Sequence, residues 1–197
     1  MIRSTVAIGL LALLGVAQAG AEPFRHSGEW REYNRDWLAA CPERINEDDT
    51  TSYYGTSCFA SAGSVELNDA NLPVYKLTLL HNRLTGAIDI AFTYAPSDGS
   101  TLDTSRPLTV RFGADAPMTF AGDALETRYD TTNQFFVADP ELRETLLDAM
   151  RERNAATITV PVTGAPAERR VTLSMRGVLA SLDFMHTYAR RVGSYDE

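Results

Sequence analysis

Apolar and polar residues alternate strictly through residues 87–95, AIDIAFTYA. A strand exposes successive side chains on opposite faces, so this period of two predicts a half-buried strand. One face carries Ile88, Ile90, Phe92 and Tyr94, and the other carries Asp89, Ala91 and Thr93. A chain built from such strands must pair them into sheets that bury one face, which restricts the fold more than any other feature here.

Further strands are predicted on both sides of this one. Residues 108–113 alternate again and place Leu108, Val110 and Phe112 inward, with a hairpin return at residues 118–122. The segment 72–80 is expected to turn Leu72, Val74 and Leu79 toward a core. The remaining candidates are 127–138, which is weaker, and the pair 155–162 and 169–175, which is predicted to form a hairpin.

Two short helices are predicted in the C-terminal part of the chain. Asp139 is a typical N-cap and Pro140 suits the first helical position. An apolar stripe follows, made of Leu142, Leu146, Leu147 and Met150. After Gly177, residues 178–192 predict a second helix with Leu179, Leu182 and Met185 inward.

These elements predict one domain of mainly β class over residues 22–197, an antiparallel β-sandwich with one or two short helices. The alternative is an α+β arrangement. Trp30, Tyr33 and Trp37 fit either one helical face or strand and turn positions, and the sequence leaves both open. The expected total is seven or eight strands.

The first 21 residues predict a secretory signal peptide. Arg3 is their only charge, residues 6–16 are an unbroken run of apolar residues and glycine, and Ala17-Gln18-Ala19 is a small-x-small cleavage site. The run is too short to cross a bilayer, and no later stretch is apolar enough to do so. The mature protein is therefore expected in the periplasm or outside the cell, without a transmembrane segment.

Cys41 and Cys58 are the only cysteines in the chain. In an oxidising compartment such a pair is expected to form a disulfide, which would close a loop of 18 residues. The pair lacks the C-x-x-C spacing of redox-active sites, and two cysteines without clustered histidines make only half a zinc site. The bridge is thus predicted to be structural, and no metal or other cofactor is expected.

Composition argues against an anionic partner surface. The formal net charge is −8, and removing Arg3 with the signal peptide makes it −9. An acidic chain does not suit nucleic acid or an anionic membrane. Lys76 is the only lysine among 18 basic residues.

No residue pattern identifies a catalytic site. His26, His81 and His186 are far apart in the sequence and belong to no metal-binding motif. Asp98, Gly99, Ser100 and Asp103 lack the ligand spacing of a calcium loop and are interpreted as a turn. The acidic run 47–49 is interpreted as a solvated loop. The chain is therefore predicted not to be an enzyme.

Several of these features together resemble the invasion-associated locus B family of exported bacterial proteins. The chain has a signal peptide, an early tryptophan, a cysteine pair, a strand-rich centre, a leucine-rich helix and a terminal strand. The matching positions are Leu146, Leu147 and Met150 in the helix and Ser174, Met175, Gly177 and Leu179 at the end. The chain departs from the family in lacking its second cysteine pair and in carrying Val178 where an aromatic residue is usual, which indicates a distant member.

The resemblance implies a periplasmic or surface-associated, non-enzymatic accessory protein that binds a protein or a cell-envelope component. Two alternatives stay open. One is an exported hydrolase whose site assembles from scattered acids and histidines. The other is a small-ligand carrier with an apolar cavity lined by residues such as Phe92 and Phe112.

Overall fold

The computed structural model describes residues 22–48 and 53–192. The predicted signal peptide, residues 1–21, lies outside the described residues, as does Asp49 of the acidic run.

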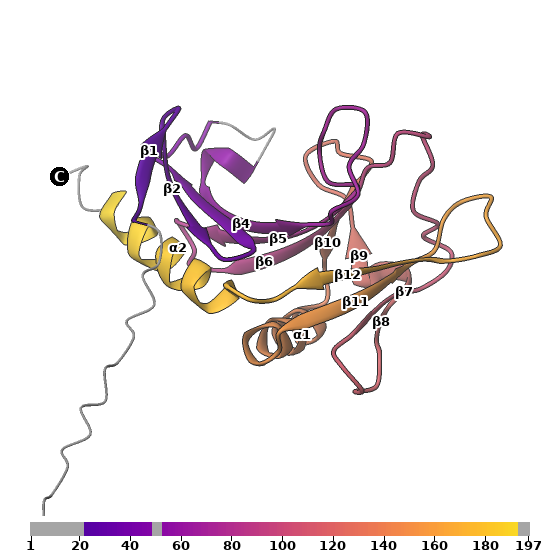
Figure 1. The fold of residues 1–197 in the computed structure, drawn as a ribbon. Helices are drawn as coiled ribbons and strands as arrows, with labels where there is room; N and C mark the ends of the chain where they lie inside the picture. The colour runs from indigo at the N-terminus through magenta and orange to yellow at the C-terminus, as the bar shows by residue number, and fades with distance from the viewer. Residues whose placement is uncertain (1–21, 49–52, 193–197) are drawn as a thin grey trace, which may run out of the picture.

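Two antiparallel sheets form the framework (Figure 1), so the predicted mainly β sandwich is confirmed. The larger sheet has eight strands in the order β1-β2-β3-β4-β5-β6-β10-β9. Their bounds are β1 Phe24–His26, β2 Glu29–Asn34, β3 Trp37–Pro42, β4 Ser57–Gly63, β5 Tyr75–Asn82, β6 Ile88–Tyr94, β9 Leu125–Glu126 and β10 Gln134–Val137. The smaller sheet has the order β12-β11-β7-β8, with bounds β7 Leu108–Arg111, β8 Met118–Phe120, β11 Ala155–Val160 and β12 Arg169–Ser174.

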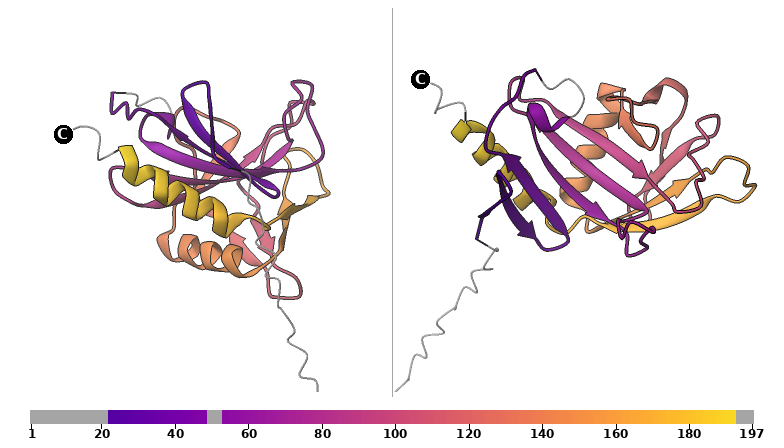
Figure 2. Two further views of the ribbon diagram at one scale, coloured as in Figure 1. Left: turned by 60° about the vertical axis from the view of Figure 1, so that its left-hand side comes forward. Right: turned by 90° about the horizontal axis from the view of Figure 1, so that it is seen from above.

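The second layer of the sandwich is part sheet and part helix. The helices α1 (Pro140–Glu152) and α2 (Val178–Val192) lie on the same side of the eight-stranded sheet (Figure 2). Helix α2 packs mainly against β2, β3 and β4, and α1 packs against β6 and β10. The four-stranded sheet completes the layer, and one large apolar core fills the space between the layers.

The sequence predicted most of these elements, with fewer strands than the twelve in the described residues. The alternation in β6 is confirmed, because Ile90, Phe92 and Tyr94 are buried in the main core. The hairpins β7–β8 and β11–β12 form as expected. The segment with spaced aromatic residues forms strands β1 to β3 and no helix.

Helix α1 begins as its sequence predicts. The Asp139 side chain accepts hydrogen bonds from the backbone N–H groups of Glu141 and Leu142, at 2.8 and 3.0 Å. Pro140 follows at the first helical position, where its missing N–H costs nothing. The stripe is also confirmed, since Leu146, Leu147 and Met150 are buried and Leu142 packs partly against the core.

Two leucines predicted to point inward are exposed. Leu179 is 57% exposed, because the buried stripe of α2 begins one residue earlier and runs through Val178, Ser181, Met185 and Tyr188. Leu72 is 59% exposed, because it lies in the loop before β5 rather than in the strand. Val74 and Leu79 are buried as predicted.

The β2–β3 turn is anchored on the connection between β12 and α2. The indole Nε1 of Trp37 donates to the Ser174 carbonyl at 2.9 Å, and the Ser174 hydroxyl donates to Asp36 Oδ2 at 2.6 Å. Gly177 lies directly against the backbone of Asn34. These contacts join residues about 140 positions apart and fix the turn against the start of α2.

The predicted Cys41–Cys58 disulfide is present. It joins neighbouring antiparallel strands, β3 and β4, just beyond the register pair of Ala40 with Phe59. Both cysteines belong to the main core and are 1% and 0% exposed.

Candidate functional site: a groove on the outer face of the larger sheet

The outer face of the eight-stranded sheet, away from the helices, carries a small apolar cluster of its own. It consists of Ala40, Tyr53, Phe59, Leu80, Ala91 and Phe136. Tyr53 comes from a short 3₁₀ helix, η1 (Tyr53–Gly55), which lies within the disulfide-closed loop. The ring of Tyr53 meets that of Phe59 edge-on, and it meets the ring of Tyr129 in the same way. Part of the disulfide loop is therefore anchored on this outer face.

A groove of about 720 Å³ lies beside this cluster. Its floor follows one register row across four strands, in which Gly63 pairs with Lys76, Lys76 with Thr93, and Thr93 with Gln134. The neighbours of Lys76 in sequence, Tyr75 and Leu77, are buried in the core. Because side chains alternate along a strand, Lys76 must therefore face the groove.

Three connections and the 3₁₀ helix form the walls of the groove. Tyr33 comes from the end of β2, Arg35 and Asp36 from the β2–β3 turn, and Tyr53 from η1. The loop before β5 and the loop before β10 supply the remaining rim residues, namely Asn68, Leu72, Pro73, Thr131 and Asn133. The lining thus combines amides, hydroxyls and two tyrosine rings with few charges.

Lys76 is the distinctive residue of this groove. It is half-buried, yet its side chain makes no hydrogen bond and no ion pair with the described residues. Burial lowers the pKa of Lys76 from its ordinary value, and no neighbouring charge or hydrogen bond contributes to that shift. A partly desolvated ammonium without a partner costs free energy, which an anionic ligand would recover.

A second polar group on the floor also lacks a partner. The Thr93 hydroxyl, next to Lys76 in the register, is buried and makes no hydrogen bond with the described residues. Unsatisfied buried polar atoms are uncommon in folded proteins, so each one calls for an explanation. A ligand that brings an acceptor to Lys76 and a hydrogen-bonding group to Thr93 would satisfy both.

The lining is suited to binding more than to acid–base chemistry. Asp36 is its only carboxylate, and that carboxylate already accepts a hydrogen bond from Ser174. No histidine or cysteine is among the residues that line the groove. Burial also raises the pKa of Tyr53, which keeps its hydroxyl neutral.

Sequence reasoning did not find this groove. It singled out Cys41 and Cys58, which the structure places in the core on the other face of the sheet. The available signal was that the only lysine occupies the polar position of a strand, between Tyr75 and Leu77. The walls come from loops far apart in the sequence, and their meeting could not be read from spacing.

The structure brings together two of the three histidines. The ring of His81 on β5 stacks on that of His186 on α2, with centroids 5.8 Å apart, whereas His26 lies at the edge strand β1. The Nδ1 atom of His81 is buried and has no hydrogen-bond partner in the described part of the chain. His81 is directly opposite Cys58 in the register, so it belongs to the packing beneath α2 and not to the groove.

We expect acid to destabilise the fold through His81. The side chain is 7% exposed, and burial lowers its pKa below the ordinary 6.5, with smaller contributions from His186 and Arg83. The unfolded chain then binds a proton at higher pH than the folded chain does. The contribution of neutral His81 to the free energy of unfolding is therefore fully present above about pH 6.5. It is lost as pH drops toward the folded-state pKa.

Urea unfolding from pH 7.5 to 5 measures this effect. The variant His81→Gln should reduce the slope of stability against pH, and the exposed His26→Gln should leave it unchanged. An equal slope in wild type and His81→Gln would contradict the assignment.

Other residues considered from the sequence have structural explanations. Asp98 accepts hydrogen bonds from the backbone N–H and the hydroxyl of Ser100, which makes the predicted turn. These hydrogen bonds hold the pKa of Asp98 at about 2. Within the described ranges, no group of three or more histidine, cysteine, aspartate or glutamate residues is placed to hold a metal ion.

The apolar residues named for a carrier cavity pack into the core. Phe92 and Phe112 both belong to the main apolar cluster. The space beside Phe92 between the two sheets measures only about 10 Å³, which is about one water-sized probe. The interior of the sandwich at this point offers no room for a ligand.

In the described part of the chain, no helix combines the length and the apolar character needed to cross a bilayer. No protein-family model, curated protein sequence or solved structure matches this chain.

Proposed function

We propose that this chain is an exported, non-enzymatic accessory protein of the bacterial envelope, and that it binds a polar, carboxylate-bearing ligand in the groove over Lys76. The observation that carries the proposal is the unpartnered, half-buried ammonium on the groove floor. The likeness to the invasion-associated locus B family and the signal-like residues 1–21 support the envelope setting. The buried disulfide suits an oxidising compartment.

A carboxylate is the ligand group that best fits the electrostatics. Lys76 offers one compact positive charge, and Arg35 and Asp36 on the wall carry opposite charges, so the lining as a whole suits a ligand with a single negative charge. The amides of Asn68, Asn133 and Gln134 offer donors and acceptors to hydroxyl groups. Tyr33, which is 53% exposed, provides an aromatic ring for an apolar edge of the ligand. An acidic sugar has a carboxylate, hydroxyl groups and an apolar ring edge, and so matches this lining.

The proposal predicts opposite effects of Lys76→Met on stability and on binding. Removing an unpaired, half-buried charge should raise the free energy of unfolding by about 0.5–2 kcal/mol. Losing the charged hydrogen bond to ligand should weaken binding by about 10- to 100-fold. Urea unfolding measures the first effect, and titration with D-glucuronate, with D-glucose as the uncharged control, measures the second.

Because Lys76 is the only lysine, its side chain can be observed alone. Protein labelled with ¹³C-lysine should give a single side-chain signal whose pKa lies below 10.5 and rises when glucuronate binds. Affinity should also fall as pH rises through that pKa. A Lys76 signal that titrates normally and ignores every carboxylate would refute the groove as an anion site.

Photo-crosslinking in cells tests the envelope role. A photoreactive phenylalanine replaces Leu72 on the groove rim, and the matched control replaces Leu84, which is 52% exposed on the β5–β6 turn. A product formed at position 72, absent at position 84 and lost with Lys76→Met would support the proposal. Products that form equally at both positions would argue against a specific groove ligand.

An assay of the purified protein on a glucuronoside tests the hydrolase alternative. Release of a cleaved product from a glucuronoside by wild-type protein, lost on replacing Asp36, would favour it over simple binding.

A further inference from the structure

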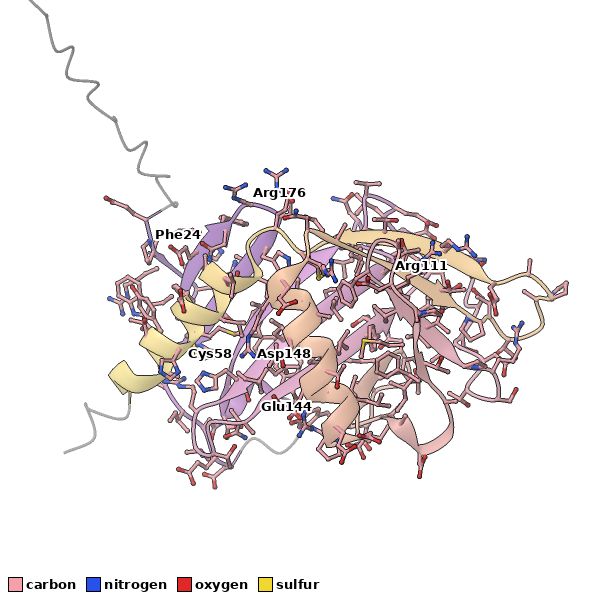
Figure 3. The ribbon with its side chains drawn as sticks, turned by 90° about the horizontal axis from the view of Figure 1, so that it is seen from below. Phe24, Cys58, Arg111, Glu144, Asp148 and Arg176 are labelled. Carbon is pink, nitrogen blue, oxygen red and sulfur yellow. A yellow bond between two sulfur atoms is a disulfide. The ribbon has the colours of Figure 1, made fainter. Side chains whose placement is uncertain are left out.

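A second pocket lies next to the β2–β3 turn, away from the Lys76 floor. It measures about 360 Å³ and is lined from three places: the turn, the end of α1 and the connection between β12 and α2. Arg176, on that connection, lies beyond the C-terminal end of α1, while Asp148 and Glu144 lie further back along the helix (Figure 3). The anchoring of the turn on Ser174 brings these segments together.

The lining of this pocket is strongly basic for an acidic protein. Four arginines contribute, namely Arg35, Arg151, Arg153 and Arg176, against one carboxylate, Glu152. The chain as a whole has a formal charge of −8. Four arginines and one glutamate around one concave site favour an anionic ligand, which the net charge of the whole chain does not.

Three of these arginines, Arg151, Arg153 and Arg176, have either exposed partners or none among the described residues. Arg151 pairs with Asp148 and Arg153 with Asp115, but those carboxylates are 66% and 51% exposed. Exposed ion pairs contribute at most about 1 kcal/mol, so a ligand of higher charge can displace them. The Arg176 side chain forms no ion pair or hydrogen bond with the described residues.

We propose that this pocket binds a phosphate group, with Arg176 as its main contact. A phosphate monoester carries a charge of about −1.5 to −2 and three acceptor oxygens, which several guanidinium groups can share. Guanidinium forks match phosphate geometry and outnumber the single Glu152 in the lining. Leu179 is exposed in the same pocket and offers an apolar contact to the group that carries the phosphate.

This site differs from the Lys76 groove in the ligand that it selects. The groove has Lys76 on its floor and one arginine and one aspartate on its wall, which suits a single negative charge, whereas several arginines suit a doubly charged group. The two sites share only Arg35 among the basic residues that line them, so each can be tested without the other.

The test compares two arginines that are matched in exposure and charge. Arg176 and Arg111 are both exposed, both lack ion pairs among the described residues, and both are labelled in Figure 3. Calorimetric titration uses inorganic phosphate and glucose 6-phosphate at low salt. We expect Arg176→Gln to weaken binding by about 10-fold or more, since a charged hydrogen bond is lost. Arg111→Gln should bind like wild type.

Two sources of the phosphate are distinguished by vesicle sedimentation. Vesicles of phosphatidylcholine with phosphatidic acid present a lipid phosphomonoester, and vesicles of phosphatidylcholine alone are the control. Binding of either the soluble phosphates or the phosphatidic acid vesicles, lost in Arg176→Gln and kept in Arg111→Gln, supports the site and identifies the source. Equal losses in both variants, or no binding by wild type to any probe, overturns the proposal. Thermal melting of the two variants checks that both stay folded.

Discussion

Replacing Gly177 by alanine is expected to lower the free energy of unfolding by about 3–5 kcal/mol, which combines backbone strain with a clash that cannot relax. Gly177 has φ of +112°, which side-chain-bearing residues rarely adopt. A Cβ at this position would lie 1.8 Å from the Asn34 carbonyl oxygen. The Asn34 oxygen belongs to the backbone and cannot rotate away as a side chain could. The segment that carries it is held in place by the hydrogen bonds of Trp37 and Asp36 with Ser174.

The matched control is Gly164→Ala. Gly164 also has positive φ, +74°, but a Cβ there meets nothing within 4 Å. Its cost should be limited to the conformational penalty of about 1–2 kcal/mol. Urea unfolding of the two variants separates strain from clash. Similar losses in both would show that the approach to Asn34 is unimportant for stability.

Removal of the disulfide is expected to lower the free energy of unfolding by about 2–4 kcal/mol. The variant is Cys41→Ala with Cys58→Ala, which avoids placing hydroxyl groups in the main core where both sulfurs lie. Thermal melting should rank oxidised protein above reduced protein and the double variant. Identical melting of all three, or free thiols in the native protein, would contradict a structural role.

Limited trypsin digestion reports on the loop between Cys41 and Cys58. Arg44 is an exposed cleavage site between the two cysteines. In wild type, a chain cut there stays joined until reductant is added, because Cys41 and Cys58 flank the cut. In the double variant the two fragments should separate without reductant, and the cut should form faster.

The sequence predicted the elements whose signals are local. Asp139 and Pro140 define the start of α1 by side-chain chemistry within four residues, and alternation identifies β6. In α2, Met185 is buried and Leu182 packs against the core as predicted. Only Leu179 was placed wrongly, because Leu179 and Val178 are both apolar and only packing decides which one is buried. The prediction that Leu72 points inward was wrong for a similar reason, since an apolar residue next to a strand does not show where the strand begins.

The candidate sites depend on contacts that spacing does not encode. Lys76 stands out only when its neighbours across the sheet are known. These are Gly63, Thr93 and Gln134, and none of them is a carboxylate. The arginine-lined pocket needs the β2–β3 turn to reach the start of α2, a contact made through Trp37 and Ser174. The disulfide was predictable because its argument concerns the compartment and the number of cysteines, not the packing.

The position of Tyr53 links thiol oxidation to the groove. Tyr53 belongs to the segment that the Cys41–Cys58 bond closes, yet it forms a wall of the groove on the opposite face of the sheet. A chain with free thiols lacks the covalent bond that closes the segment carrying this wall. If the groove binds the proposed ligand, the reduced protein should therefore bind it more weakly than the oxidised protein does.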